Sequence, residues 1–236
     1  RFWIDYLRCE RDNVEAALDT AVARGDAQLA IEIVAPIGWY FFMSGELEAG
    51  RVMLGAALAC DGLTEPALRA AALGVYGWLV VNGAQLEHAV AATSEAMSLI
   101  ERIDDAWMRA LVASTDVMAN FFAGHLDTVE TLQVGLRKLA DEAADAWAIG
   151  IADLIDGEIA QFRAGAGQAE AAFERATSSF AASGDQFLYA LTLTESAEIA
   201  EWRGDYDCAV GMLERAMSIA ERVGFSVHPM AMRSRL

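Results

Sequence analysis

The chain has 236 residues, of which 55% are hydrophobic and 22% charged, and its formal net charge is -18. Nucleic acids and anionic membranes are recognised through positive surfaces, so this acidic balance argues against both as direct partners. Only three prolines interrupt the chain. Long segments can therefore be continuous helices.

Three cysteines and one long uncharged run bear on the cellular setting. Cys9, Cys60 and Cys208 are far apart and lack metal-ligand spacing, which favours a reduced cytoplasmic protein. The longest uncharged run, Ala70–Leu86, is shorter than the roughly 20 apolar residues that span a bilayer. We expect no membrane span. Because the chain begins at Arg1 and starts in a helical pattern, we also expect a fragment of a longer multidomain protein.

All predicted elements are helices, because apolar residues recur at spacings of three and four with no alternation of the strand type. An opening pair is predicted over Phe2–Cys9 and Asn13–Arg24. The helices that follow are predicted, in chain order, over 26–43, 46–60, 65–82, 85–102, 105–123, 126–142, 145–163, 167–182, 185–203 and 206–223. Beyond them, Phe225–Leu236 begins a further unit that is not completed.

Short polar residues and glycines mark the predicted helix ends. Side-chain oxygens that can accept from the first free N–H groups of a helix stand at Thr64, Asp105, Asp145 and Asp185. Turns within each unit, where a helix can end in the left-handed conformation, are predicted at Gly45, Gly83, Gly124, Gly165 and Gly204.

Small residues recur every 40 positions along the chain. One column is Ala49, Ala89, Val129, Ala169 and Ala209, and another is Ala56, Ala96, Leu136, Ala176 and Ala216. Self-similarity at such a period is typical of stacked repeats, and small residues let crossing helices approach closely. The sequence therefore predicts an all-α, right-handed superhelix of antiparallel helix pairs. We expect one domain over 1–236, with opening helices over 1–44 and repeats of about 40 residues over 45–236.

Two resemblances accompany this repeat. The spacing of Gly157, Ala169 and Ala176 resembles the small-residue pattern of tetratricopeptide repeats, although the period here is longer and implies longer helices. At the amino end stand the run 12–18 (Asp-Asn-Val-Glu-Ala-Ala-Leu) and then Gly38-Trp39. These motifs resemble the helical region that follows the ATPase module in large actinobacterial transcriptional regulators of the LuxR and SARP type, some fused to adenylyl cyclase.

This second resemblance implies a function in transcriptional regulation and signal transduction. It implies a non-catalytic protein-interaction or sensor module adjoining the ATPase and DNA-binding domains of a parent chain. One departure is Glu15, where the family often carries arginine. The sequence itself contains no nucleotide-binding loop.

For catalysis the sequence offers little. The histidines stand singly, and no nucleophile or metal-binding motif is present. The tightest acidic group is Asp153, Asp156 and Glu158, which could serve acid–base chemistry if buried. Carboxylates at this spacing more often form a solvated face or pair with a neighbouring repeat. We expect no enzyme activity, no cofactor and no metal site.

The candidate binding surface is the inner face formed by the first helix of each unit. Its predicted members are Trp78, Asn82, Met118, Phe121, Phe122, Glu158, Gln161, Phe162, Glu198, Glu201 and Trp202. Such a groove, apolar in its amino half and acidic in its carboxyl half, suits a protein or peptide with large apolar anchors and basic flanks.

Three alternatives stay open at this point. The aromatic residues could instead be core between repeats. The same concave pocket could receive a small-molecule effector near Trp78, Phe122 and Phe162, oriented by Asn82 and Gln161. The chain could also form homo-oligomers through helices at its ends.

Overall fold

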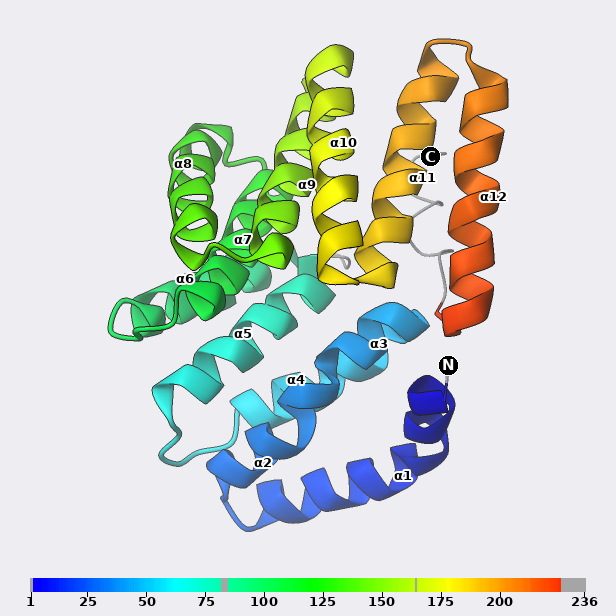
Figure 1. Ribbon diagram of the computed structural model, residues 1–236. Helices are drawn as coiled ribbons and strands as arrows, with labels where there is room; N and C mark the ends of the chain where they lie inside the picture. Colours follow the sequence, from blue (N-terminus) through cyan, green and yellow to red (C-terminus); the bar gives the residue numbers. More distant parts are fainter. Residues whose placement is uncertain (1, 82–84, 164, 226–236) are drawn as a thin grey trace. The chain divides into compact units, whose positions relative to one another are not determined.

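The computed structural model describes residues 2–81, 85–163 and 165–225, and every regular element among them is helical (Figure 1). The chain divides into two compact units, Phe2–Gly135 and Leu136–Leu236. Each is treated by itself below, as the amino-terminal and the carboxyl-terminal unit. The continuity of one domain over 1–236 and the handedness of a superhelix stay predictions.

The amino-terminal unit contains the first helices of the chain, coloured blue to green in Figure 1. They are α1 (Phe2–Ala23), α2 (Ala27–Val34), the 3-10 turn η1 (Ala35–Ile37), α3 (Gly38–Ser44), α4 (Leu47–Leu58), α5 (Pro66–Val81), α6 (Leu86–Ile100), α7 (Ala106–Phe122) and the first part of α8 (Leu126–Ala143). Within this unit α5 packs against α4, α6 and α7.

The carboxyl-terminal unit begins within α8 and continues as two helical pairs. These are α9 (Ala146–Phe162) with α10 (Ala166–Ser183), and α11 (Gln186–Trp202) with α12 (Tyr206–Val223). Each pair packs along its length, and α10 also contacts α11. From 46 onward the predicted helix bounds agree with the observed ones to within two residues.

Two predictions near the amino end are wrong. The opening pair is one continuous helix, α1, because no glycine or proline stands between Phe2 and Arg24 to break it. The single helix predicted over 26–43 is instead α2, η1 and α3. Pro36 has no N–H to donate, so the chain passes through a short 3-10 turn there.

The segment Ala27–Ser44 is long and apolar enough to cross a membrane by length and composition alone. Half of it is buried inside the structure. Its interruption by η1 leaves no unbroken helix of the required length. The apolar character of this segment therefore serves the core of the amino-terminal unit.

Three of the four predicted helix starts are confirmed. The carboxylates of Asp105, Asp145 and Asp185 accept from N–H groups in the first turns of α7, α9 and α11. Thr64 is wrong, because α5 begins at Pro66 and Glu65 is the residue directly before it. A proline supplies the helical φ angle at a first position without needing a cap for its own nitrogen.

The predicted glycine turns are confirmed at Gly45, Gly124 and Gly204, whose φ angles are 77°, 81° and 78°. Gly165 is different, since its φ of -89° places it as the residue before α10 rather than as a left-handed helix end. Gly83 lies outside the described residues, as does most of the predicted unit 225–236.

The column of small residues is buried from the second repeat onward. Ala89, Ala169 and Ala209 are at most 1% exposed. In the first repeat the register is shifted by one position, because Gly50 and Ala57 are buried there while Ala56 is exposed. Gly50 lies against the Phe41 ring, where a larger residue has no room.

The tightest helix contact of the carboxyl-terminal unit joins α9 and α10 at two glycines. An ideal Cβ at Gly157 would lie 2.3 Å from Cε1 of Phe173, and one at Gly150 would lie 2.8 Å from Cε1 of Phe180. Both rings are fully buried. The two phenylalanines therefore occupy the space that side chains on α9 would take.

Replacing Gly157 with alanine is expected to lower the free energy of unfolding by about 1–3 kcal/mol, because the added methyl group overpacks a buried ring. The control is Gly211→Ala in α12, where an added Cβ meets no atom within 4 Å. That change should stabilise the chain by about 0.4–1 kcal/mol by restricting the unfolded state. Urea unfolding measures both, and equal stabilisation by the two substitutions would contradict the contact.

Candidate functional site

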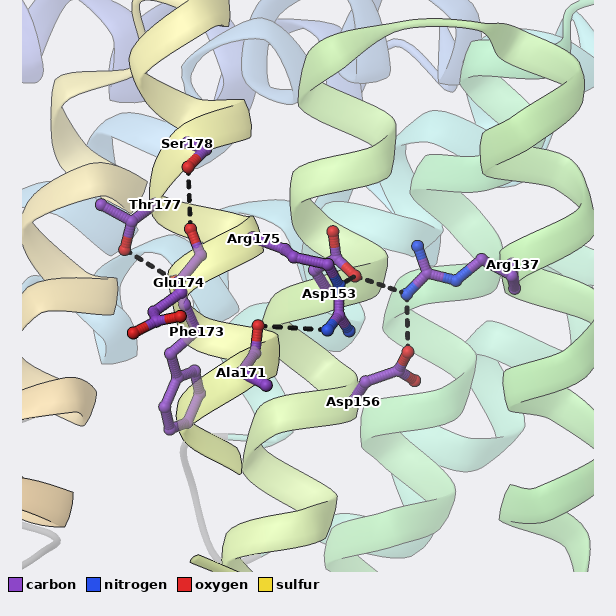
Figure 2. A network of polar contacts seen from close by, with 9 residues as sticks. All are labelled: Arg137, Asp153, Asp156, Ala171, Phe173, Glu174, Arg175, Thr177 and Ser178. Carbon is purple, nitrogen blue, oxygen red and sulfur yellow. Dashed lines mark hydrogen bonds and ion pairs between the residues drawn. The ribbon is translucent and has the colours of Figure 1, made fainter. Parts of the chain in front are cut away.

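The acidic group at Asp153 is an ion-pair network rather than a free acid–base pair. Asp153 on α9 is buried, with a side chain that is 4% exposed. Arg137 Nη2 on α8 donates to Asp153 Oδ1 at 2.9 Å and to Asp156 Oδ2 at 2.6 Å, and Arg175 Nε on α10 donates to Asp153 Oδ1 at 3.0 Å (Figure 2). Two guanidinium groups thus hold the carboxylates, which pair with neighbouring helices as one of the sequence alternatives states.

The predicted groove residues of the amino-terminal unit are mostly not on the surface. Trp78 is 7% exposed and Met118 is 1% exposed. The Trp78 ring lies 6.2 Å from Trp39 and 6.0 Å from Phe42, measured between centroids. Both residues are core, which corrects their assignment to an open groove and removes Trp78 from the predicted effector pocket.

The other three predicted groove positions of this unit differ from one another. Phe121 is half-buried, and Phe122 is 37% exposed at the end of α7. Their rings are 5.5 Å apart. Asn82 lies outside the described residues.

The predicted aromatic residues of the carboxyl-terminal unit are on the surface. Phe162 is 68% exposed and Trp202 is 57% exposed. They are the last residues of α9 and α11. Exposed rings of this size are costly in water, and they are common where a partner docks.

Between these two helices the predicted polar residues meet in register. The Gln161 side chain donates a hydrogen bond to the Glu198 carboxylate. Three residues earlier on each helix, the charge of Glu158 acts on Glu195. Because residue numbers increase in the same direction along both helices from one interaction to the next, α9 and α11 run parallel. The structure thus brings together Glu158, Gln161 and Glu198 as part of one surface.

Glu195 is a member of this surface that the sequence interpretation missed. Burial first, and then the negative charges of Glu158 and Glu198, raise the pKa of the Glu195 carboxyl from 4.5 to about 8. Its place three residues before Glu198 puts it on the same side of α11. That helical spacing is the signal that could have found it.

Glu198 and Glu201 complete the acidic part of the surface. Burial raises the pKa of Glu198, the hydrogen bond from Gln161 opposes that shift, and the charge of Glu201 adds to it. We call these residues the acidic–aromatic face, which consists of Glu158, Gln161, Phe162, Glu195, Glu198, Glu201 and Trp202.

A second buried polar group lies in the amino-terminal unit and holds α6 to α7. Thr93 Oγ1 donates to Asp116 Oδ1 at 2.7 Å, and Asn120 Nδ2 donates to the same oxygen at 3.2 Å. Burial raises the pKa of Asp116, and the two donors oppose that shift. These hydrogen bonds satisfy a buried carboxylate within the core.

Metal binding finds no support in the part of the chain that the structure describes. Over residues 2–81, 85–163 and 165–225, no three histidine, cysteine, aspartate or glutamate side chains are grouped so that they could hold a metal ion.

Comparisons with known proteins give fold likeness alone. No family model and no curated protein matches the chain. A solved structure of a Rap protein complexed with competence and sporulation factor has a TM-score of 0.70 and 17% identity, over 82% of this chain and 54% of that chain. This chain therefore spans about half the length of that protein. BtubC from P. vanneervenii has a TM-score of 0.60 and 13% identity, over 92% of both chains.

These likenesses show that the chain has a TPR-like helical-repeat fold, as the 40-residue period predicts. The resemblance of its amino end to LuxR and SARP regulators stays a prediction.

The raised pKa of Glu195 predicts a stability that depends on pH. In the unfolded chain this carboxyl releases its proton near 4.5, whereas in the folded chain it keeps the proton up to about 8. The folded state binds more protons in that window, so stability should decrease as pH rises from about 5 to about 8. Glu195→Gln should weaken this decrease and leave the variant more stable than the wild type at pH 8.

Urea midpoints measured across this pH range give the comparison. Glu174→Gln on the exposed side of α10 is the matched control, since it makes the same substitution at an exposed position. Parallel pH profiles for the wild type and Glu195→Gln would contradict the assignment.

Proposed function

We propose that this chain is a non-catalytic protein-interaction module whose acidic–aromatic face docks a basic peptide or helix. The observation that carries the proposal is the environment of Glu195 and Glu198. The carboxylates of Glu158 and Glu198 act on Glu195, and the carboxylate of Glu201 and the neutral amide of Gln161 act on Glu198. Carboxylates gathered in partial burial are costly because their charges repel one another, and a cation from a partner relieves that cost.

Helix polarity supports the same partner. Gln161 and Phe162 stand in the last turn of α9, and Glu201 stands in the last turn of α11. The carboxyl end of a helix carries a partial negative charge, so acidic side chains there are disfavoured and a cation is favoured. A lysine or arginine of a partner would therefore be attracted both by the acidic side chains and by the carboxyl ends of the two helices.

The exposed rings of Phe162 and Trp202 supply the apolar part of the proposed surface. Large aromatic side chains are the usual energetic centres of protein interfaces. α9 and α11 are the first helices of successive pairs, the position that lines the concave surface in helical-repeat proteins. The Rap structure contains a bound factor, so a protein with this fold can hold a binding partner.

The proposal is tested with a labelled 12-residue peptide of leucine and lysine in helical amphipathic order. Fluorescence anisotropy should show saturable binding to the wild type, and the affinity should decrease as salt is added. The double variant Phe162→Ala, Trp202→Ala should bind at least about tenfold more weakly, since each ring is expected to contribute about 1 kcal/mol or more.

Two controls sharpen this experiment. A peptide with glutamate in place of lysine should not bind, because it meets a surface of the same charge. Trp3→Ala removes a ring that is 70% exposed in the amino-terminal unit, and it should leave the affinity unchanged. Equal binding of both peptides, or equal loss in both variants, would count against the proposed face.

In the finer form of this proposal the module is the interaction arm of an ATP-dependent transcriptional regulator. The support is the amino-end sequence pattern, Asp12–Leu18 with Gly38-Trp39. A docked partner would shift the packing of the arm against the ATPase module and so its assembly. ATP hydrolysis and oligomer size of the parent protein should both change when the arm is deleted, and identical values would refute this role.

A further inference from the structure

We propose that a pocket between α10, α11 and α12, separate from the acidic–aromatic face, binds a small organic oxyanion. Its volume is about 370 Å³, within the range of small-molecule sites. Arg215 and Arg222 of α12 line it together with Gln186 and Tyr189 of α11. All of these residues belong to the carboxyl-terminal unit.

The partners of the two arginines set them apart from other arginines in this unit. Arg137, Arg175 and Arg203 are each bound to carboxylates. Arg222 Nη2 instead donates to the neutral Oε1 of Gln186 at 2.9 Å, and the Arg215 guanidinium lies 5.1 Å from the centre of the Tyr189 ring. These neutral partners orient the guanidinium groups without cancelling their charge.

The spacing of Arg215 and Arg222 along α12 lets both side chains line the same pocket. They are seven residues apart on α12, which is about two helical turns or 10.5 Å between Cα atoms. Ser218 and Ile219 stand between them on the same side of the helix, and both line the pocket. The pocket therefore has a hydroxyl and an apolar group flanked by two positive charges.

The other residues that line the pocket indicate which molecular scaffold would bear the ligand's anionic group. Tyr189 is 8% exposed and Ile219 is 6% exposed, so they offer apolar surface at the bottom. Ala181 of α10 forms part of the wall, and its short side chain leaves the space open. A planar ring bearing a carboxylate or phosphate fits this arrangement, with the ring against Ile219 and the oxygens at the guanidinium groups.

Asp185, directly before α11, does not neutralise this site. Asp185 precedes Gln186, but one of its oxygens accepts from the Leu188 N–H at 2.9 Å and the other from Trp147 Nε1 at 3.0 Å. Its carboxylate is thus used within the fold. In a chain of net charge -18, two arginines without carboxylate partners in a pocket form a local positive site.

The test compares three probes that share one ring: 4-fluorophenyl phosphate, 4-fluorobenzoate and 4-fluorobenzylamine. Fluorine NMR titrations of the whole chain should show saturable binding of one or both anions and none of the amine. Binding of the phosphate alone, or of the benzoate alone, identifies which oxyanion the pocket takes. Loss of binding at high salt is expected for a charge-dependent site.

Variants locate the binding in the pocket. Arg215→Gln and Arg222→Gln should each weaken anion binding about tenfold, the usual effect of losing one charge-assisted hydrogen bond. Ala181→Leu keeps both arginines but fills the space, and it should abolish binding. Arg203→Gln removes an arginine paired with Glu170 and should leave the affinity unchanged.

Circular dichroism shows that each variant stays folded, which is expected because Ala181, Arg215 and Arg222 are exposed. The proposal is overturned if the wild type binds neither anion, if it binds the amine equally, or if the arginine variants and Ala181→Leu bind as the wild type does. The peptide-docking proposal does not depend on any of these outcomes, because its residues are different.

Discussion

The close contact of α9 with α10 is the constraint on which the carboxyl-terminal unit depends. Gly150 and Gly157 are two turns apart on one stripe of α9, and each lies against a buried phenylalanine of α10. Asp153 stands on the same stripe and binds Arg175 of α10. Three contacts at matching antiparallel positions therefore fix both the separation and the register of this pair.

This register also determines which side chains of α9 point away from α10. Glu158 and Phe162 are one and five residues beyond Gly157, so they point away from the stripe that meets α10. Asp153 contributes more to orientation than to stability, since burying an ion pair costs about as much as its attraction returns. Its bonds to Arg137 and Arg175 hold α8, α9 and α10 in one arrangement. The α9 part of the acidic–aromatic face is thus placed by contacts on other sides of that helix.

Much of the fold could be predicted from the sequence because its signals are local. Capping aspartates such as Asp145 act within one helical turn, and apolar spacing within a helix needs no knowledge of neighbours. The interruption at Pro36 was readable in principle from one residue. The shift at Gly50 and Ala57 was not, because it depends on how the Phe41 ring packs. An alignment at a fixed period carries no information about such a shift.

The candidate site was less predictable for the same reason. The exposure of Phe162 and the burial of Trp78 differ although both are aromatic residues near the ends of first helices. The rings of Trp39 and Phe42 pack around Trp78, whereas Phe162 is 68% exposed at the end of its helix. Glu195 aligns with the apolar Ile155 one period earlier, so comparison between repeats conceals it. Residues distant in the sequence determine whether these side chains are buried, and the sequence around each position does not reveal those neighbours.

Asp185 gives the folding of the last helical pair a cooperative character. One carboxylate oxygen caps α11 through the Leu188 N–H, while the other accepts from the indole of Trp147 at the start of α9. A single side chain thereby joins helix initiation to helix docking. The first turn of α11 cannot fray without also releasing the indole of α9. Opening of the first turn of α11 is therefore coupled to release of the α9 indole, so that neighbouring repeats share one polar contact.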